Sequence, residues 1–185
     1  MKKLIIVAGI ACEEKKQIAR QLAKQMGCAY VNKDSICKDF TDYIMKKNTS
    51  SQKEKENYIY RSEVNRLEYI STLKVCKDLI ENGINVVAEM PLASQIENFE
   101  KYKLLSVIAG IPFDTETKFI WVKNDIEKEL TASDSKLFHA TSWNEYISLQ
   151  DGLQIDDGYH CIEVKYSKPA EEAAAWIIDQ LNNQQ

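Results

Sequence analysis

The chain has 185 residues, 44% of them hydrophobic, and its 24 basic and 28 acidic residues give a formal net charge of −4. This length and apolar content are typical of a compact globular fold and exclude a disordered, collagen-like or disulfide-scaffolded chain. The five cysteines form no C-x-x-C pair, so no zinc motif is recognisable. The first apolar run is too short for a signal peptide and no stretch approaches the ~20 residues of a membrane span, so we expect a cytoplasmic protein without a membrane segment.

Charge is unevenly distributed along the chain. Residues 1–77 contain 16 basic and 9 acidic residues, whereas residues 78–185 contain 8 and 19. Because the basic residues alternate with acidic ones and no RNA-binding signature accompanies them, we expect a solvated surface and no nucleic-acid partner. Only three basic residues are arginines, and none follows Arg66.

The N-terminal part alternates between strand and helix patterns. The apolar run at 3–8 predicts a strand buried on both faces of a parallel sheet. A helix is predicted at 13–26, where apolar residues recur every four positions and Gly27 follows as a C-terminal cap. A second strand at 28–31 and a second helix at 35–47 complete the order expected of a βαβ unit.

The same alternation continues through the middle of the chain. The polar stretch 48–57 predicts a loop, and a long helix follows at 58–82. Its expected buried side is formed by Leu67, Ile70, Leu73, Cys76 and Ile80. A third strand is predicted at 84–89 and a helix at about 94–109, which ends before Pro112. The expected buried side of this second helix is formed by Phe99, Leu105 and Ile108.

The C-terminal part contains two more predicted strands, at 118–122 with Trp121 in the core and at 159–164, and a final helix from Ser167. Asn124 or Asp125 is a suitable cap for a helix after the fourth strand. The irregular stretch at about 126–158 has the character of a lid. We therefore predict a three-layer α/β fold with a five-stranded parallel sheet, whose ligand crevice lies at the carboxyl ends of the strands.

The loop after the first strand is the first candidate for chemistry. Phosphate-binding loops have the pattern G-x-x-x-x-G-K-[ST], and here the stretch reads G-I-A-C-E-E-K-K. Gly9 and Lys15 match the pattern, whereas Glu14 replaces the second glycine and Lys16 replaces the hydroxyl residue. The candidate cofactor-binding residues are Gly9, Cys12, Lys15 and Lys16.

Several short motifs accompany this loop. Asp34 follows the second predicted strand, a G-x-x-V-V-x-E run spans 83–89, and a W-x-x-Y motif spans 143–146. Together with the element order, they resemble the P-loop kinases that include chloramphenicol phosphotransferase, polynucleotide kinase and gluconate kinase. The resemblance spans nearly the whole chain and implies a single domain over residues 1–185, ATP and Mg²⁺ as cofactors, and a nucleotide or small-molecule substrate.

The resemblance also implies roles for individual residues. Lys15 matches the phosphate-binding lysine, Asp34 matches the base that accepts the proton of the substrate hydroxyl, and Glu89 lies near the carboxylate that supports Mg²⁺. Residues 126–139 correspond to the lid. No protein side chain is assigned as a direct metal ligand.

The sequence departs from the family pattern at several of these places. Glu13 and Glu14 put carboxylates where phosphate oxygens belong, and at ~5 Å with an effective dielectric constant of ~20 each charge pair repels by roughly 3 kcal/mol. Lys16 cannot ligate Mg²⁺ as a hydroxyl does. The lid contains no arginine to clamp a phosphoryl group.

Each candidate also has a structural interpretation. Glu13 and Glu14 complement the positive end of a helix, and Asp34 is as good a cap for the helix near Ser35 as it is a general base. His139 and His160 have no ligand-type spacing, and we expect surface roles for both.

Two functions from different classes follow. The first is a P-loop kinase-fold protein related to ATP-dependent phosphotransferases acting on a hydroxyl, with ATP chemistry impaired by a degenerate Walker A loop. The alternative is a non-catalytic pseudokinase that binds a protein partner or an altered ligand. A third and weaker hypothesis is a protein that processes nucleic-acid ends through its basic N-terminal half.

Overall fold

The structure is a computed structural model that describes residues 2–9, 13–48, 59–92, 95, 98–123, 155–165 and 168–183. Three sequence-based predictions lie mostly or wholly outside these ranges: the polar loop at 48–57, the helix after Asp125 and the lid-like segment at 126–158. The motif residues Cys12, Trp143 and Tyr146 and the histidine His139 lie outside them as well.

A parallel sheet of five strands forms the centre of the described structure. Its strands are β1 (Lys3–Ala8), β2 (Ala29–Asn32), β3 (Val86–Glu89), β4 (Glu116–Lys123) and β5 (Ile162–Lys165). They pair in the order β2-β3-β1-β4-β5, and every pair is parallel. The predicted five-stranded parallel sheet is therefore confirmed.

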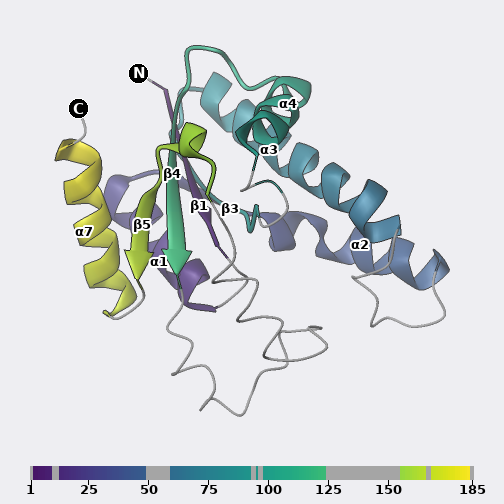
Figure 1. The fold of residues 1–185 in the computed structure, drawn as a ribbon, viewed down its shortest axis with the longest axis horizontal. Coiled ribbons are helices and arrows are strands. Elements are labelled where there is room, and N and C mark those ends of the chain that lie inside the picture. Colours follow the sequence, from purple (N-terminus) through teal and green to yellow (C-terminus); the bar gives the residue numbers. More distant parts are fainter. Residues whose placement is uncertain are drawn as a thin grey trace, which may run out of the picture.

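Helices cover both faces of the sheet (Figure 1). The α-helices are α1 (Glu13–Met26), α2 (Lys33–Asn48), α3 (Asn65–Glu81), α4 (Phe99–Ala109) and α7 (Ala170–Asn183). A π-helical turn at Tyr60–Val64 leads into α3, and a 3₁₀ turn at Asp157–Tyr159 precedes β5. Helices α1 and α7 lie on one face, and α3 and α4 lie on the other. No helix in the described ranges is long and apolar enough to cross a bilayer.

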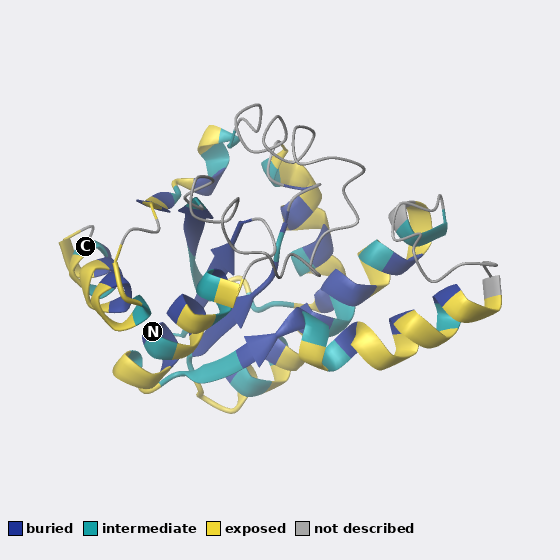
Figure 2. Cartoon of the chain, turned by 90° about the horizontal axis from the view of Figure 1, so that it is seen from below, coloured by how far each residue is buried: buried dark blue, intermediate teal, exposed yellow. Residues whose placement is uncertain are grey.

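Successive residues of β1 face opposite layers of the core. Leu4, Ile6 and Ala8 pack in the cluster that includes α3 and α4, whereas Ile5 and Val7 pack in the cluster that includes α1 and α7. The central strands are accordingly buried on both faces (Figure 2). This explains why the first strand is an unbroken apolar run and not an alternating one.

Several element boundaries differ from the prediction, and local hydrogen bonds and backbone geometry explain two of them. The backbone N–H and the hydroxyl of Ser35 donate to Asn32 Oδ1 at 2.7 and 2.9 Å, so Asn32 caps α2 and the helix begins at Lys33. Strand β5 begins at Ile162 and not at Tyr159. Tyr159 is the last residue of the 3₁₀ turn, and His160 after it has a left-handed φ of 44°, which is incompatible with a strand.

The predicted buried sides of two helices were partly wrong. Leu67 on α3 is 53% exposed and Ile108 on α4 is 39% exposed. On α3 the buried side includes Glu68 and Thr72. The apolar periodicity could not show this, because it assigns a buried position only where the residue itself is apolar.

Candidate functional site

The sheet order brings the ends of three strands together. In the parallel register Glu89, at the end of β3, pairs with Val7 of β1 on one side and with Asn32 of β2 on the other. Gly9 follows β1 directly, and Lys15 lies in the first turns of α1. Gly9, Lys15, Asn32 and Glu89 therefore meet at one edge of the sheet, at the carboxyl ends of the strands, where α/β proteins place their ligand sites.

Lys15 and Glu89 form a buried ion pair at this edge. Their side chains are 0% and 3% exposed, and Lys15 Nζ lies 2.7 Å from Glu89 Oε1. Lys15 Nζ also donates to the carbonyl of Gly9 at 3.0 Å, and the Asn32 amide donates to Glu89 Oε2. The positive charge of Lys15 is therefore matched by a carboxylate inside the protein.

Asp34 and Lys16 form the accessible part of the site. Lys16 Nζ lies 3.9 Å from Asp34 Oδ2, and Lys33 Nζ lies 3.4 Å from Asp34 Oδ1. The Asp34 side chain is 43% exposed, so its carboxylate, flanked by two ammonium groups, can accept a hydrogen bond or a proton from a ligand. Because Asn32 caps α2, Asp34 lies in the first turn of the helix and is not its N-cap.

A second buried carboxylate, that of Glu68, contacts Lys33, the residue next to Asp34. Glu68 of α3 accepts hydrogen bonds from Lys33 at 2.5 Å, Thr41 at 2.6 Å and Tyr60 at 3.0 Å. Burial by itself lowers the pKa of Lys33, but the attraction to Glu68 and the hydrogen bond to it outweigh burial, and the pKa of Lys33 is raised. Glu68 therefore joins α2 to α3 through Lys33 and thereby holds the residue next to Asp34.

Sequence reasoning missed Asn32 and Glu68 as parts of this site. Asn32 had a usable signal, because an asparagine at the start of a helix pattern is a preferred N-cap. Glu68 had none, since 35 residues separate it from Lys33 in the sequence.

Gly9 is required by packing against the neighbouring strand. Its φ is +131°, and a Cβ atom at this position would lie 2.5 Å from the carbonyl oxygen of Val122 on β4. The adjacent loop residues 10–12 lie outside the described ranges. A glycine here is therefore explained by close backbone approach, independently of any phosphate.

The two glutamates of the loop both lie in the first turn of α1. Glu13 is exposed and Glu14 is half-buried. Acidic residues at this position stabilise the positive end of a helix. His160, for which a surface role is expected, is exposed.

The described charged side chains around Lys15 pair with one another. In the part of the chain that the structure describes, no three His, Cys, Asp or Glu residues are grouped as metal ligands. Glu89 is bound to Lys15 and Asn32, and Lys15 is fully buried.

Solved structures of kinases share this fold. A sugar kinase from Janibacter sp. HTCC2649 superposes with a TM-score of 0.67 at 12% identity, covering 98% of this chain and 95% of its own. The Mycobacterium tuberculosis APS kinase CysC, solved in complex with AMPPNP and APS, gives a TM-score of 0.59 at 14% identity, with 98% and 97% coverage. A Sinorhizobium meliloti gluconokinase gives 0.54 at 12%, with 100% and 97% coverage.

These similarities extend over 95% or more of the length of each kinase, and the chain shares their α/β fold. No protein-family model matches the sequence, and no curated protein matches it significantly. At these identities the likeness concerns the fold alone.

Proposed function

We propose that the protein is a P-loop kinase-fold protein related to ATP-dependent phosphotransferases, in which ATP chemistry is impaired. The observation that carries this proposal is the buried ion pair between Lys15 and Glu89. The lysine that matches the phosphate-binding position already has a counter-charge at 2.7 Å, and Lys16 stands where the pattern has a hydroxyl. A phosphate would therefore gain little from Lys15 unless the pair first separates.

Mg-ATP binding measured by calorimetry tests this proposal. We expect the wild type to show no saturable binding below millimolar nucleotide. Glu89→Gln removes the internal counter-charge while preserving the side-chain shape, so affinity should rise by about tenfold, which corresponds to ~1.4 kcal/mol. The double variant with Lys15→Ala should lose this gain. Lys24→Ala, an exposed lysine in the last turn of the same helix, is the matched control and should leave binding unchanged.

Tight Mg-ATP binding by the wild type would instead identify an ordinary phosphotransferase. Micromolar Mg-ATP binding by the wild type, lost in Lys15→Ala, would contradict an impaired site. Phosphoryl transfer to a hydroxyl that disappears in Asp34→Asn would then support Asp34 as the base.

A non-catalytic pseudokinase remains the second candidate, favoured by the same internal neutralisation of Lys15. It differs from the first candidate by one result. A pseudokinase shows no ATP hydrolysis or phosphoryl transfer at saturating nucleotide in the wild type, whereas an impaired kinase shows slow turnover that Asp34→Asn abolishes.

A further inference from the structure

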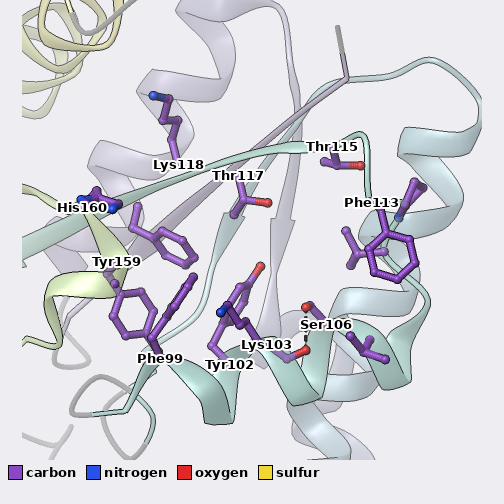
Figure 3. Close-up of a pocket in the computed structure, with 15 residues that line it drawn as sticks. Phe99, Tyr102, Lys103, Ser106, Phe113, Thr115, Thr117, Lys118, Tyr159 and His160 are labelled. Carbon is purple, nitrogen blue, oxygen red and sulfur yellow. Dashed lines mark hydrogen bonds between the residues drawn. The ribbon is translucent and has the colours of Figure 1, made fainter.

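A separate cavity lies at the opposite end of the sheet from the candidate site. It has a volume of about 550 Å³ and lies between α4 and the first half of β4, beside the turn at 158–160 (Figure 3). Thr117, which lines it, pairs with Leu4, whereas Gly9 lies beyond the other end of β1. At ~3.3 Å per residue, roughly 17 Å of strand separates the two sites. The volume is within the usual range of small-molecule pockets.

Aromatic side chains form one side of this cavity. Phe99, Tyr102, Phe119 and Tyr159 pack against one another with ring centroids 4.8 to 6.2 Å apart. At the edge of the cavity Phe113 is 98% exposed and Val107 is 59% exposed. A planar apolar ligand in the cavity would cover both of these side chains.

Two buried hydroxyl groups in the cavity wall make no hydrogen bond of normal geometry with the described residues. They belong to Tyr102, which is 4% exposed, and to Thr115. Burial raises the pKa of Tyr102 well above its usual range, and the Thr117 hydroxyl opposes this only in part, so the phenol is a neutral donor. An acceptor oxygen on a ligand would give these buried hydroxyl groups a hydrogen-bond partner of normal geometry.

The charges around the cavity favour an anion. Lys103, Lys118 and His160 line it, and none of the lining residues within the described ranges is acidic. Lys103 Nζ lies 5.1 Å above the Phe99 ring, and Tyr102 and Lys103 both extend from α4 (Figure 3). Each lysine also has a carboxylate neighbour outside the cavity, Glu100 at 2.7 Å and Glu116 at 3.6 Å, so the attraction is moderate.

From these features we infer that the cavity binds a small aromatic carboxylate. Its ring covers Phe113 and Val107, and its carboxylate accepts hydrogen bonds from the Tyr102 hydroxyl and from Lys103. The apolar wall provides affinity for the ring, while the two donors, Tyr102 and Lys103, favour an anion over a neutral group. This inference is independent of what binds at the loop after β1.

Titration of the ¹⁵N-labelled full chain, followed by NMR, tests the inference with two probes. They are 3-phenylpropionate and its neutral analogue 3-phenylpropanamide, which has the same ring and length. We expect saturable shifts of α4 and β4 amides, with the carboxylate binding about tenfold more tightly than the amide.

Three variants assign the contacts. Tyr102→Phe keeps the ring and should weaken binding several-fold, while its melting temperature stays equal to or above that of the wild type because an unpaired hydroxyl is removed. Lys103→Ala should weaken binding of the carboxylate alone. Lys101→Ala, exposed on the same helix and outside the cavity, should not.

Three results would overturn the inference: no saturable shifts at millimolar probe, equal affinity for the amide and the carboxylate, or wild-type affinity in Tyr102→Phe. A concentration-dependent dimer that broadens the same amides, detected by light scattering, would also overturn it, because it identifies a second copy of the chain as the group that covers Phe113.

Discussion

At the scale of single residues, the same side chain supports both a structural and a chemical interpretation, and its contacts distinguish them. Gly9 matches the first glycine of a phosphate-binding loop, yet its close approach to Val122 of β4 already requires a glycine. Lys15 matches the phosphate-binding lysine, yet its ammonium group is bound to Glu89 and to the Gly9 carbonyl. A motif match in the sequence is therefore compatible with a purely structural use of both residues.

The requirement at Gly9 can be measured. Gly9→Ala combines an unfavourable φ with a Cβ placed 2.5 Å from a backbone oxygen, so we expect the free energy of unfolding to fall by about 3 kcal/mol. Gly27→Ala is the matched control, because Gly27 has a φ of +64° but no atom within 4 Å of its Cβ position, and it should cost only about 1 kcal/mol. Urea unfolding compares them, and equal losses would show that β4 relaxes without strain.

At the scale of secondary-structure elements, buried polar contacts decide how helices lie against one another. Glu68 receives side-chain donors from α2 and from the π-helical turn, so it joins three elements. The helices themselves were predictable, since their apolar periodicity and capping residues are local features. The rotation of α3 about its axis was not, because the carboxylate of Glu68 is buried with its partners at a position that apolar periodicity does not mark as buried.

Removing the charge of Glu68 tests this contact. In Glu68→Gln the buried ammonium group of Lys33 loses its main counter-charge, so we expect a loss of about 3 kcal/mol in the free energy of unfolding. Glu81→Gln breaks the exposed Lys77–Glu81 pair on the same helix and should leave the free energy of unfolding almost unchanged. Chemical denaturation measures both variants, and similar small losses would mean that Thr41 and Tyr60 alone hold α2 against α3.

At the scale of the whole molecule, buried and hydrogen-bonded titratable groups set the pH range of stability. Asp156 accepts hydrogen bonds from the backbone N–H groups of Phe99 and Gly158, which lower its pKa. At the other limit the pKa of Lys33 is raised, burial opposing the shift and Glu68 causing it. Burial raises the pKa values of Tyr60 and Tyr69. Because of each shift, the group keeps the protonation state that it has at neutral pH over a wider pH range in the folded state than in the unfolded state.

The signs predict losses of stability at both ends of the pH scale. A lowered carboxyl pKa stabilises above the unfolded value of ~3.9, and this contribution is lost as the pH falls through and below it. A raised lysine pKa stabilises below ~10.4 and is lost as the pH rises above that value, and the raised tyrosine values act in the same direction above ~10. The free energy of unfolding should be measured as a function of pH. Compared with the wild type, it should change less steeply with pH in acid for Asp156→Asn and less steeply in alkali for Lys33→Met. Unchanged slopes would contradict these assignments.

The sequence by itself determined the strands, the helices and their order, because buried parallel strands, amphipathic helices and helix caps are written in residues close together along the chain. It also named Gly9, Lys15, Lys16, Asp34 and Glu89 as residues that meet at one edge of the sheet, since the ends of neighbouring parallel strands must converge there. Only the tertiary structure decided how these charges pair. The partners of Lys15 and Lys33 come from distant segments, and whether a buried lysine faces a carboxylate or an open crevice depends on side-chain packing that no local pattern records.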